Sequence, residues 1–423
     1  MVKKKTQKPD NKRNNPSDDP SSNRRCVVRV EEIKFNHDPS SHTSDALNIR
    51  KNYVEEVIVP EWRRRQTRRP EQSPAAYSIF DIDKNRVTIK VRFSVTPPNC
   101  TRADIKAQGG GILGDVKPMT VNFGFGISSP EYIEIKLDRN GIKDAGVNFQ
   151  DIEWQWMYRH IGRKKWYRMD RTRHRIYTVL KEPVAPWKQS PYPDTQNPWS
   201  DVLDFSCEWA RGTNSLDAAA AAITTKVNLP VGEFEYDNSM GSSRYTAENP
   251  YWLPSDPTPP VIFYCTMFID RLNGGPGWGK LVNCSDCASM VATFSNIVGC
   301  ELWESKMTAY FYLNEIISIG SSKWGKPFPD SVYPGMFSYH EVAWKGSAGL
   351  NDNIFDACLK VNSNEKDAKR TPDPDPIRRT PSLPLNMPFD DPGSFDYREK
   401  LVAPHSITKC LPNISYRIRR PVI

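Results

Sequence analysis

A cysteine that could act as a nucleophile stands at the start of a predicted helix. Asn283 is a good N-cap residue, and Asp286 three positions later completes a box-like start. Apolar residues then recur at helical spacing until Gly299, which supplies the left-handed residue that ends a helix. Cys284 therefore falls in the first turn, where unpaired N–H groups and the positive end of the helix dipole favour a thiolate. A small buried core residue would also fit this position.

Two further residues could complete the chemistry of acyl transfer by a thiol. That chemistry needs an imidazole within hydrogen-bond reach of the thiolate and a group that orients the imidazole. His340 lies on a predicted strand over 335–344, and Asp356 lies on the next predicted strand, over 353–361. A hairpin of these strands could bring the carboxylate beside the ring. The order and the element types therefore predict a catalytic triad of Cys284, His340 and Asp356.

These patches resemble the transglutaminase-like branch of the papain-type enzymes. In that family an acid, an alanine, an apolar residue and a glycine follow the cysteine at fixed distances. Here those positions hold Asp286, Ala288, Val291 and Gly299. The strand 339–344 and the segment 356–358 are similar to the family's histidine and acid elements. The alanine-rich stretch at 216–227 is similar to the helix before the family's nucleophile, so the resemblance covers about 205–360.

The resemblance implies a fold and a reaction. The fold would be α+β, with the cysteine helix packed on an antiparallel sheet. The reaction would form a thioacyl intermediate on a protein or peptide amide, as in a protease, a glutamine deamidase or a transglutaminase, without a cofactor. Trp278, a few residues before the cysteine, would line the oxyanion or substrate side. Val282, Asn296 and Cys300-Glu301 depart from the Gly, Arg and Ile-Pro that are usual in the family.

Cys287 is the rival nucleophile. It lies one turn deeper on the apolar face of the predicted helix, where a thiol is usually inert. Cys284 and Cys287 could instead bind zinc with Cys300 or His340, but the sequence has no second CxxC pair at finger spacing. A thioredoxin-like role is disfavoured because no βαβ pattern surrounds the pair. We therefore predict no metal site and leave a redox or metal role of Cys287 open.

Charge and composition restrict the compartment and the partners. The 423 residues carry a formal net charge of +8, and the basic residues are spread over several stretches, of which 159–175 is interleaved with Trp166 and Tyr167. This pattern suits an anionic partner or surface, while nucleic-acid binding is not the expected main role. No apolar run could span a membrane, and no apolar h-region follows the basic start. We expect a cytoplasmic protein, or one exported without a classical signal peptide, with free thiols at its nine cysteines.

Composition divides the chain into five parts. Polar residues, alternating strands and proline clusters mark the boundaries. The expected parts are a disordered basic tail at 1–25, an antiparallel β-sandwich at 26–185, a Pro-rich linker at 186–200, a transglutaminase-like catalytic domain at 201–362, and a Pro-rich extension at 363–423. Within the sandwich we expect a hairpin of 77–82 and 86–95, and within the extension a returning strand at 414–418.

Together these predictions describe a two-domain α+β enzyme that transfers acyl groups from protein or peptide amides to water or an amine. One rival hypothesis is a non-enzymatic binding or structural protein that keeps the fold. The other is a basic nucleic-acid adaptor. An exposed face that gathers the basic residues after the predicted turn at 162–163 would favour the adaptor; these are Arg163, Lys164, Lys165, Arg168 and Arg171. The sequence leaves the oligomeric state and the choice between water and amine open.

Overall fold

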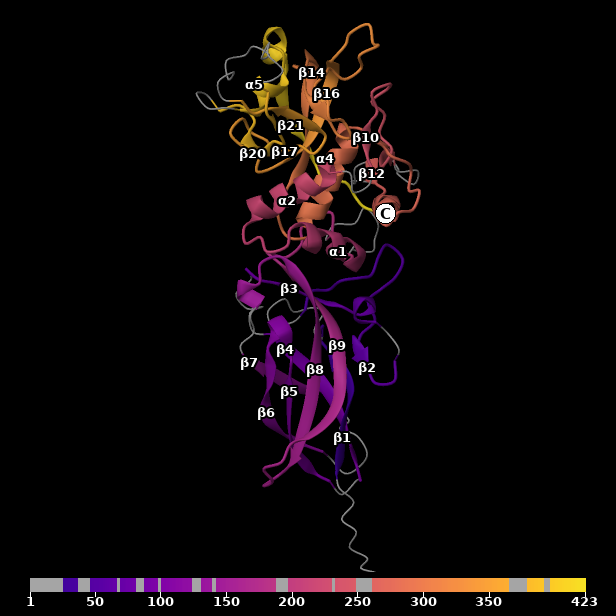
Figure 1. Ribbon diagram of the computed structural model, residues 1–423, viewed down its shortest axis with the longest axis vertical. Helices are drawn as coiled ribbons and strands as arrows, with labels where there is room; N and C mark the ends of the chain where they lie inside the picture. Colours follow the sequence, from indigo (N-terminus) through magenta and orange to yellow (C-terminus); the bar gives the residue numbers. More distant parts are fainter. Residues whose placement is uncertain are drawn as a thin grey trace, which may run out of the picture.

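The computed structural model of the chain describes residues 26–36, 46–66, 69–80, 87–97, 100–123, 131–138, 142–187, 197–229, 233–248, 261–364, 379–391 and 396–423. The expected tail, the centre of the expected linker and parts of the expected extension lie outside these described residues. Figure 1 shows two regions along the long axis, one built from a large sheet and the other from helices and smaller sheets. Within the described ranges, no helix is both long and apolar enough to cross a membrane.

Alternation of apolar and polar residues builds the large sheet. Along β4, Ile89, Val91, Phe93 and Val95 are buried, while the residues between them are partly exposed. Nine strands follow the order β2-β1-β4-β7-β6-β5-β8-β9-β3. Among the described strand pairs of this sheet, only β3 and β9 are parallel. The strands are β1 (Val27–Lys34), β2 (Trp62–Arg63), β3 (Ala75–Ser78), β4 (Thr88–Thr96), β5 (Arg102–Gln108), β6 (Asp115–Asn122), β7 (Ile133–Asp138), β8 (Asn148–His160) and β9 (Tyr167–Val179).

This sheet curls until its two halves face each other. Phe93 of β4 packs on Trp156 of β8 with ring centroids 5.7 Å apart. The backbone N–H of Val30 in β1 donates to the carboxylate of Asp170 in β9 at 2.8 Å. Both contacts join strands that are distant in the strand order, so the apolar faces close over one core. The expected sandwich is therefore one continuous sheet curled on itself, with its halves joined through the β6–β7 pair.

Two local predictions are wrong in this region. The expected hairpin of 77–82 and 86–95 is not formed, because β3 pairs with β9 while β4 pairs with β1 and β7. The expectation of free thiols fails for Cys26 and Cys100, which form a disulfide with their Cα atoms 5.8 Å apart. Antiparallel pairing of β1 with β4 brings the start of one strand to the end of the other, which places these two cysteines together. The other seven cysteines are free and buried.

Helices packed on a second sheet form the other region. A five-stranded antiparallel sheet has the order β20 (Leu385–Pro388), β17 (Asn353–Phe355), β16 (Met336–Trp344), β14 (Trp303–Tyr312) and β21 (Leu411–Ile418). The helix α4 (Cys284–Asn296) packs on β16 and β14, and α1 (Ser200–Trp209) and α2 (Leu216–Asn228) pack on α4. The protein is therefore of mixed α+β class, with the cysteine helix on an antiparallel sheet as expected.

Short strands and helices surround this layer. The strand pairs are β10 (Glu235–Tyr236) with β13 (Leu281–Val282), β11 (Thr246–Glu248) with β12 (Val261–Phe263), and β15 (Ile317–Ser318) with β18 (Leu359–Asn362), which also pairs with β19 (Pro381–Ser382). Two further α-helices of the described chain are α3 (Cys265–Leu272) and α5 (Tyr397–Leu401). The strand expected over 353–361 is thus divided between two sheets, with Asp356 at the break. The expected returning strand is part of β21.

The two regions share a buried contact. The indole N–H of Trp187 donates to the backbone carbonyl of Thr293 in α4 at 3.1 Å. Arg175 and Tyr177 of β9 both donate to the carboxylate of Asp204 in α1, at 3.0 and 2.6 Å. The strand β9 therefore bonds to α1, and Trp187 bonds to α4, the helix that carries Cys284.

Candidate active site

The helix α4 begins with the capping that its sequence predicts. The side chain of Asn283 accepts the N–H of Asp286 at 3.0 Å, and the carboxylate of Asp286 accepts the N–H of Asn283 at 3.2 Å. Cys284 is the first helical residue. After the helix, Gly299 has a φ of +92°, a conformation that side chains other than glycine rarely adopt. The thiol therefore lies in the first turn, where the helix favours negative charge.

The carboxylate of Asp286 also ties this helix start to the neighbouring strand. It accepts the backbone N–H groups of Arg244, Tyr245 and Thr246 at 2.8 to 2.9 Å, and Thr246 lies in β11. Burial raises the pKa of Asp286 to about 6, although these hydrogen bonds favour the charged form. The start of α4, and with it Cys284, is thus held by hydrogen bonds to the segment that leads into β11 as well as by its own cap.

His340 and Asp356 meet in the core, as the sequence predicts. The Nε2 of His340 lies 2.9 Å from Oδ2 of Asp356, and both side chains are buried. The same oxygen accepts the hydroxyl of Tyr397 at 2.7 Å. The other oxygen accepts the backbone N–H groups of Cys358 and Leu359 at 2.7 and 3.1 Å. Asp356 is therefore held by its own turn and by α5, and this turn is why the expected strand breaks here.

The neighbouring thiol of Cys284 contributes to the pKa of the His340 ring. Burial lowers the pKa of His340, but the charge and hydrogen bond of Asp356 and the adjacent Cys284 outweigh burial and raise this pKa to about 10. Nε2 is engaged by Asp356, and Nδ1 is buried without a hydrogen-bond partner of regular geometry in the described residues. A protonated ring would thus keep Nδ1–H free to act on a thiolate or on a leaving group. Cys284 itself is 4% exposed.

Cys287 has a different environment one turn further along α4. A hydrogen bond with Cys358 lowers the pKa of Cys287, but burial and the neighbouring acids outweigh it and raise the pKa above the ordinary value. The side chain is 1% exposed, so the neutral thiol behaves as a core residue. Cys300 donates to the backbone carbonyl of Leu216 at 3.3 Å, beyond the other end of the helix. In the part of the chain that the structure describes, no three His, Cys, Asp or Glu side chains are arranged to hold a metal ion.

Trp278 packs against Tyr264. Trp278 is 40% exposed, and the centroids of the two rings are 4.1 Å apart. Its backbone N–H donates to the hydroxyl of Tyr245 at 3.3 Å, and Tyr245 is one of the residues bound to Asp286. Among the described residues, no hydrogen bond or ring contact joins Trp278 to the thiol or the imidazole. Two tyrosines, Tyr236 and Tyr339, lie close enough to Cys284 to respond to it. Burial, and then the charge of Cys284, raises the pKa of both phenols.

A buried charge network links the neighbours of Cys284 and His340. The hydroxyl of Ser285 donates to Glu341 at 2.6 Å, and Glu341 lies 2.7 Å from the guanidinium of Arg420. Arg420 also pairs with Glu304, whose carboxylate accepts the hydroxyl of Ser289 at 2.5 Å. Sequence reasoning missed this network, because Arg420 is distant in the chain. The only signal was that Ser285 and Glu341 directly follow two predicted site residues.

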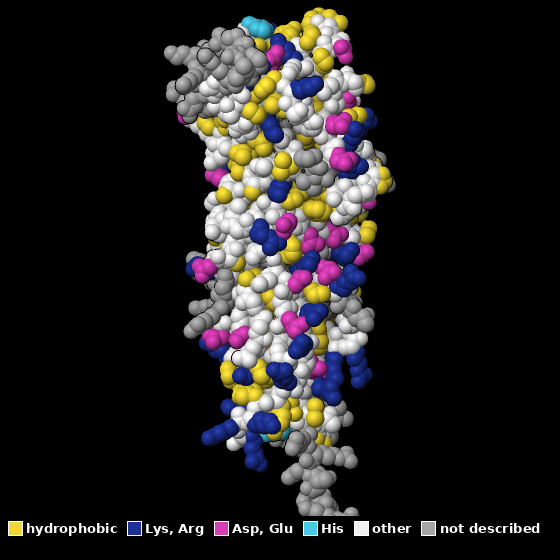
Figure 2. Space-filling model, viewed as in Figure 1, with side chains coloured by type: hydrophobic (Ala, Val, Ile, Leu, Met, Phe, Trp, Pro, Cys, Tyr) yellow, Lys and Arg dark blue, Asp and Glu magenta, His cyan; other side chains and the backbone are white. Residues whose placement is uncertain are grey.

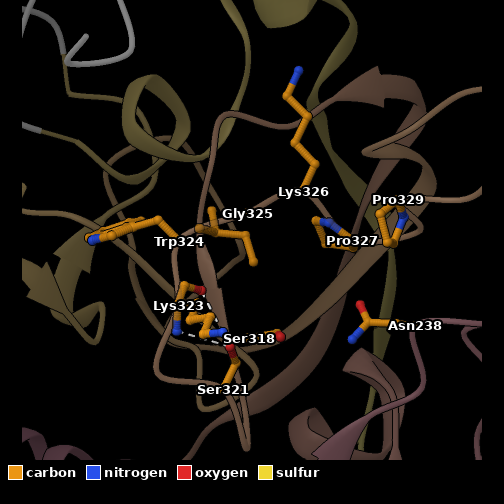
Figure 3. Close-up of a pocket in the computed structure, with 10 residues that line it drawn as sticks. Asn238, Ser318, Ser321, Lys323, Trp324, Gly325, Lys326, Pro327 and Pro329 are labelled. Atoms are coloured by element: carbon orange, nitrogen blue, oxygen red, sulfur yellow. Dashed lines mark hydrogen bonds between the residues drawn. The ribbon is translucent and has the colours of Figure 1, made fainter. Parts of the chain in front are cut away.

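The described part of the chain also contains a pocket of about 300 Å³ (Figure 3). Its lining includes Asn238, Ser318, Trp324 and Lys326. Phe328 follows the pocket residue Pro327, and its ring is 5.6 Å from that of Phe337, which in turn is 5.7 Å from the ring of His340. Two neighbouring aromatic rings, Phe328 and Phe337, therefore connect the edge of the pocket to the imidazole.

Comparisons with known proteins give little support beyond this geometry. No protein-family model matches the chain, and a search of curated proteins finds no match. Among solved structures, the chain is similar to the crystal structure of red sea bream transglutaminase, with 10% sequence identity and a TM-score of 0.32. The match covers 71% of this chain and 50% of that chain, so this chain spans about half of that structure. Similarity at this level carries no conclusion on fold or activity.

Proposed function

We propose that the protein is a cysteine-dependent acyl-transfer enzyme that acts on protein or peptide amide bonds. Cys284 is the nucleophile, His340 the acid and base, and Asp356 the group that orients and charges the ring. The observation that carries the proposal is the buried His340–Asp356 hydrogen bond of 2.9 Å beside a cysteine in the first turn of a helix. A core histidine without a chemical role would not need a buried carboxylate fixed by three further donors.

The reaction has two steps. The Cys284 thiolate attacks the amide carbonyl, the His340 imidazolium gives its proton to the nitrogen, and the C–N bond breaks to release ammonia or an amine. The product of this step is a thioester on Cys284 and a neutral imidazole. Water or an amine then attacks the thioester while His340 takes its proton, and cleavage of the C–S bond restores the thiolate and the imidazolium. Asp356 orients the ring and stabilises the imidazolium of the resting state.

Trapping of the thioester tests this proposal. The full chain is incubated with glutamine-containing peptides and a fluorescent primary amine, and intact-mass spectra are recorded during the reaction. We expect a peptide-sized adduct on wild type that is lost in Cys284→Ala and His340→Ala, together with amine incorporation or ammonia release. An adduct that persists in Cys284→Ala would contradict the assignment of the nucleophile. Circular dichroism of both variants checks that the fold is kept.

The nucleic-acid adaptor remains the rival that one observation favours. Figure 2 shows Lys and Arg gathered at the end of the molecule where β8 turns into β9, and the tip residues Arg163, Lys164 and Lys165 are exposed. Arg168 and Arg171 are also exposed, but Arg171 lies 3.4 Å from Glu153, which is paired with Arg173 at 2.6 Å. Arg171 and Arg173 are thus partly neutralised, while the described residues provide no ion pair for the basic side chains at the tip. Binding of labelled DNA or RNA that falls steeply with salt would support this rival.

A further inference from the structure

One wall of the pocket in Figure 3 is attached to the segment before the nucleophile. Asn238 lines the pocket, and its neighbour Asp237 donates its backbone N–H to the carbonyl of Val282 at 2.9 Å. Val282 lies two residues before Cys284. The side chain of Asp237 accepts the N–H groups of three loop residues, which fixes the turn that carries Asn238. This wall and the start of α4 therefore hold a constant relative position.

A second wall is attached to the turn that holds the acid. Ser318 of β15 lines the pocket, and the next residue, Ile319, donates its backbone N–H to the carbonyl of Cys358 at 2.7 Å. Cys358 is one of the two residues whose N–H groups bind Asp356. A ligand in the pocket would thus rest against the supports of both the nucleophile and the acid.

The lining is cationic and has no acidic residue of its own. Two lysines, Lys323 and Lys326, line the pocket on exposed positions, and no Asp or Glu does. The described residues provide neither ammonium group with an ion-pair partner. In Figure 3 the Lys326 side chain extends away from the other lining residues, and its flexible stem would have to turn back to reach an anion in the pocket. Both ammonium groups are therefore available to pair with an anionic ligand.

Neutral donors and flat apolar surfaces complete the lining. Figure 3 shows the side-chain amide of Asn238 directed toward the pocket from the side opposite Trp324. Ser318 is 8% exposed, and its hydroxyl has no partner among the described residues. Amide and hydroxyl groups can donate to a carboxylate or phosphate, and ammonium groups strengthen such bonds. Trp324 and Pro327 offer surface for the methylene stem of a side chain.

We propose that this pocket is a substrate subsite that binds an anionic side chain of the polypeptide whose amide reaches Cys284. The inference rests on the proposed function and gives it a substrate class: proteins or peptides with an acidic or phosphorylated residue near the reacting amide. Glutamate and phosphoserine share this chemistry, and the experiment separates them. The size of the pocket suits one side chain rather than a folded domain.

Binding to a chain that cannot turn over tests the subsite independently of catalysis. Fluorescein-labelled peptides of one sequence, with Glu, phosphoserine, Gln or Lys at a scanned position, are titrated with full-length Cys284→Ala and followed by anisotropy. We expect the anionic peptides to bind about threefold to tenfold more tightly than the Gln peptide, because exposed charge pairs are each worth a few tenths to one kcal/mol. The larger gain identifies the preferred anion. Equal affinity for all four peptides at every scanned position would overturn the proposal.

Charge reversal locates the preference. Lys326→Glu and Lys323→Glu, each in the Cys284→Ala chain, should abolish the preference for the anionic peptides and favour the Lys peptide. Lys164→Glu changes the net charge by the same amount at the far tip of β8–β9 and should leave the preference unchanged. A preference that survives both pocket variants overturns the subsite. If the subsite is correct while wild type forms no thioester, the proposed function fails alone; if the thioester forms without a preference, the subsite fails alone.

Discussion

Asp356 sets the protonation of His340 at the scale of single residues. The folded pKa of His340 is about 10, above its ordinary value of 6.5, because the carboxylate and the thiol outweigh burial. At neutral pH the ring is therefore an imidazolium, ready to give its proton to a leaving amine. Tyr397 and two backbone N–H groups hold the carboxylate, so its orientation does not depend on the histidine alone.

Asp356→Asn should lower the pKa of His340, since an amide holds no charge to favour the imidazolium. Titration of the ring carbon signals by NMR measures this value in wild type and variant. Tyr397→Phe is the matched control, because it removes a donor to the same oxygen but keeps the carboxylate. A ring pKa that is unchanged in Asp356→Asn would contradict the electrostatic role assigned to the acid.

The same pair makes stability depend on pH. Because the folded pKa of His340 is raised, the stabilisation from the pair is fully present below about pH 6.5 and is lost as pH rises through about 10. Urea unfolding should therefore show a larger loss for Asp356→Asn at pH 6 than above pH 10. An equal loss at both pH values would mean that Asp356 stabilises the fold only through its backbone hydrogen bonds.

The two cysteines of α4 should respond differently to truncation. Cys284→Ala should abolish thioester formation and keep the fold, because it removes one sulfur from a helix start. Cys287→Ala should keep the chemistry and lower the free energy of unfolding by about 1–2 kcal/mol, as expected for a small buried group. Thermal or urea unfolding and the intact-mass assay measure the two effects. Loss of the adduct in Cys287→Ala alone would move the nucleophile by one helical turn.

At the scale of elements, β21 and the residues after it support the site through Arg420. Burial raises the pKa of Glu304, and Arg420 opposes this effect with its positive charge. Glu341 shares the same guanidinium and accepts the hydroxyl of Ser285, next to the nucleophile. Removal of this cation would leave the buried carboxylate of Glu304 without its ion pair and would leave Glu341 with only Lys306, at 3.8 Å, which is a costly arrangement.

Arg420→Met should therefore lower the free energy of unfolding by about 3–5 kcal/mol. Adding Glu304→Gln and Glu341→Gln should recover much of this loss, since the uncompensated charges are then gone. Arg419→Met serves as the control, because Arg419 is only half-buried and lies over the ring of Trp303. Urea unfolding at neutral pH measures all four chains. A loss in Arg420→Met no greater than in Arg419→Met would show that the network does not hold the element in place.

Local signals in the sequence predicted the helix and the strand that carry Cys284 and His340. The pairing of strands that are distant in the sequence was not predictable from such signals. Capping residues placed Cys284 in the first turn, and alternation identified β4, because both are local consequences of backbone geometry. The partners of β4 are 27–34 and 133–138, which no local turn signal indicates, so the hairpin prediction failed. The role of Trp278 was assigned from resemblance alone and stays a prediction. The contacts of Arg420 and Tyr397 depend on strand and helix placement that the sequence pattern does not contain.

At the scale of the whole molecule, the large sheet and the helix layer are joined by buried side chains at the two ends of the expected linker. Trp187 and Trp199 are fully buried with their rings 5.6 Å apart, and Trp187 bonds to α4. Because of this contact, we expect the two expected domains to stay together after the chain is cleaved between them.

A protease site inserted between residues 188 and 196 tests this addition. After cleavage, the two fragments should elute together in size-exclusion chromatography at neutral pH and separate only in denaturant. Asp204→Ala, which removes the partner of Arg175 and Tyr177 across the same contact, should weaken the association. Separate elution of the cleaved wild-type fragments without denaturant would contradict the buried contact and favour independent domains.

Selective alkylation tests the central claim that Cys284 and His340 form a reactive pair. The native full-length chain is treated with iodoacetamide at mildly acidic pH, where ordinary thiols are protonated and slow, and the modified cysteines are mapped by mass spectrometry. We predict that Cys284 reacts first among the seven free cysteines and that His340→Ala slows its reaction at least tenfold, while Cys287 stays unmodified. Preferential modification of another cysteine, or an unchanged rate at Cys284 in His340→Ala, would contradict the cysteine mechanism.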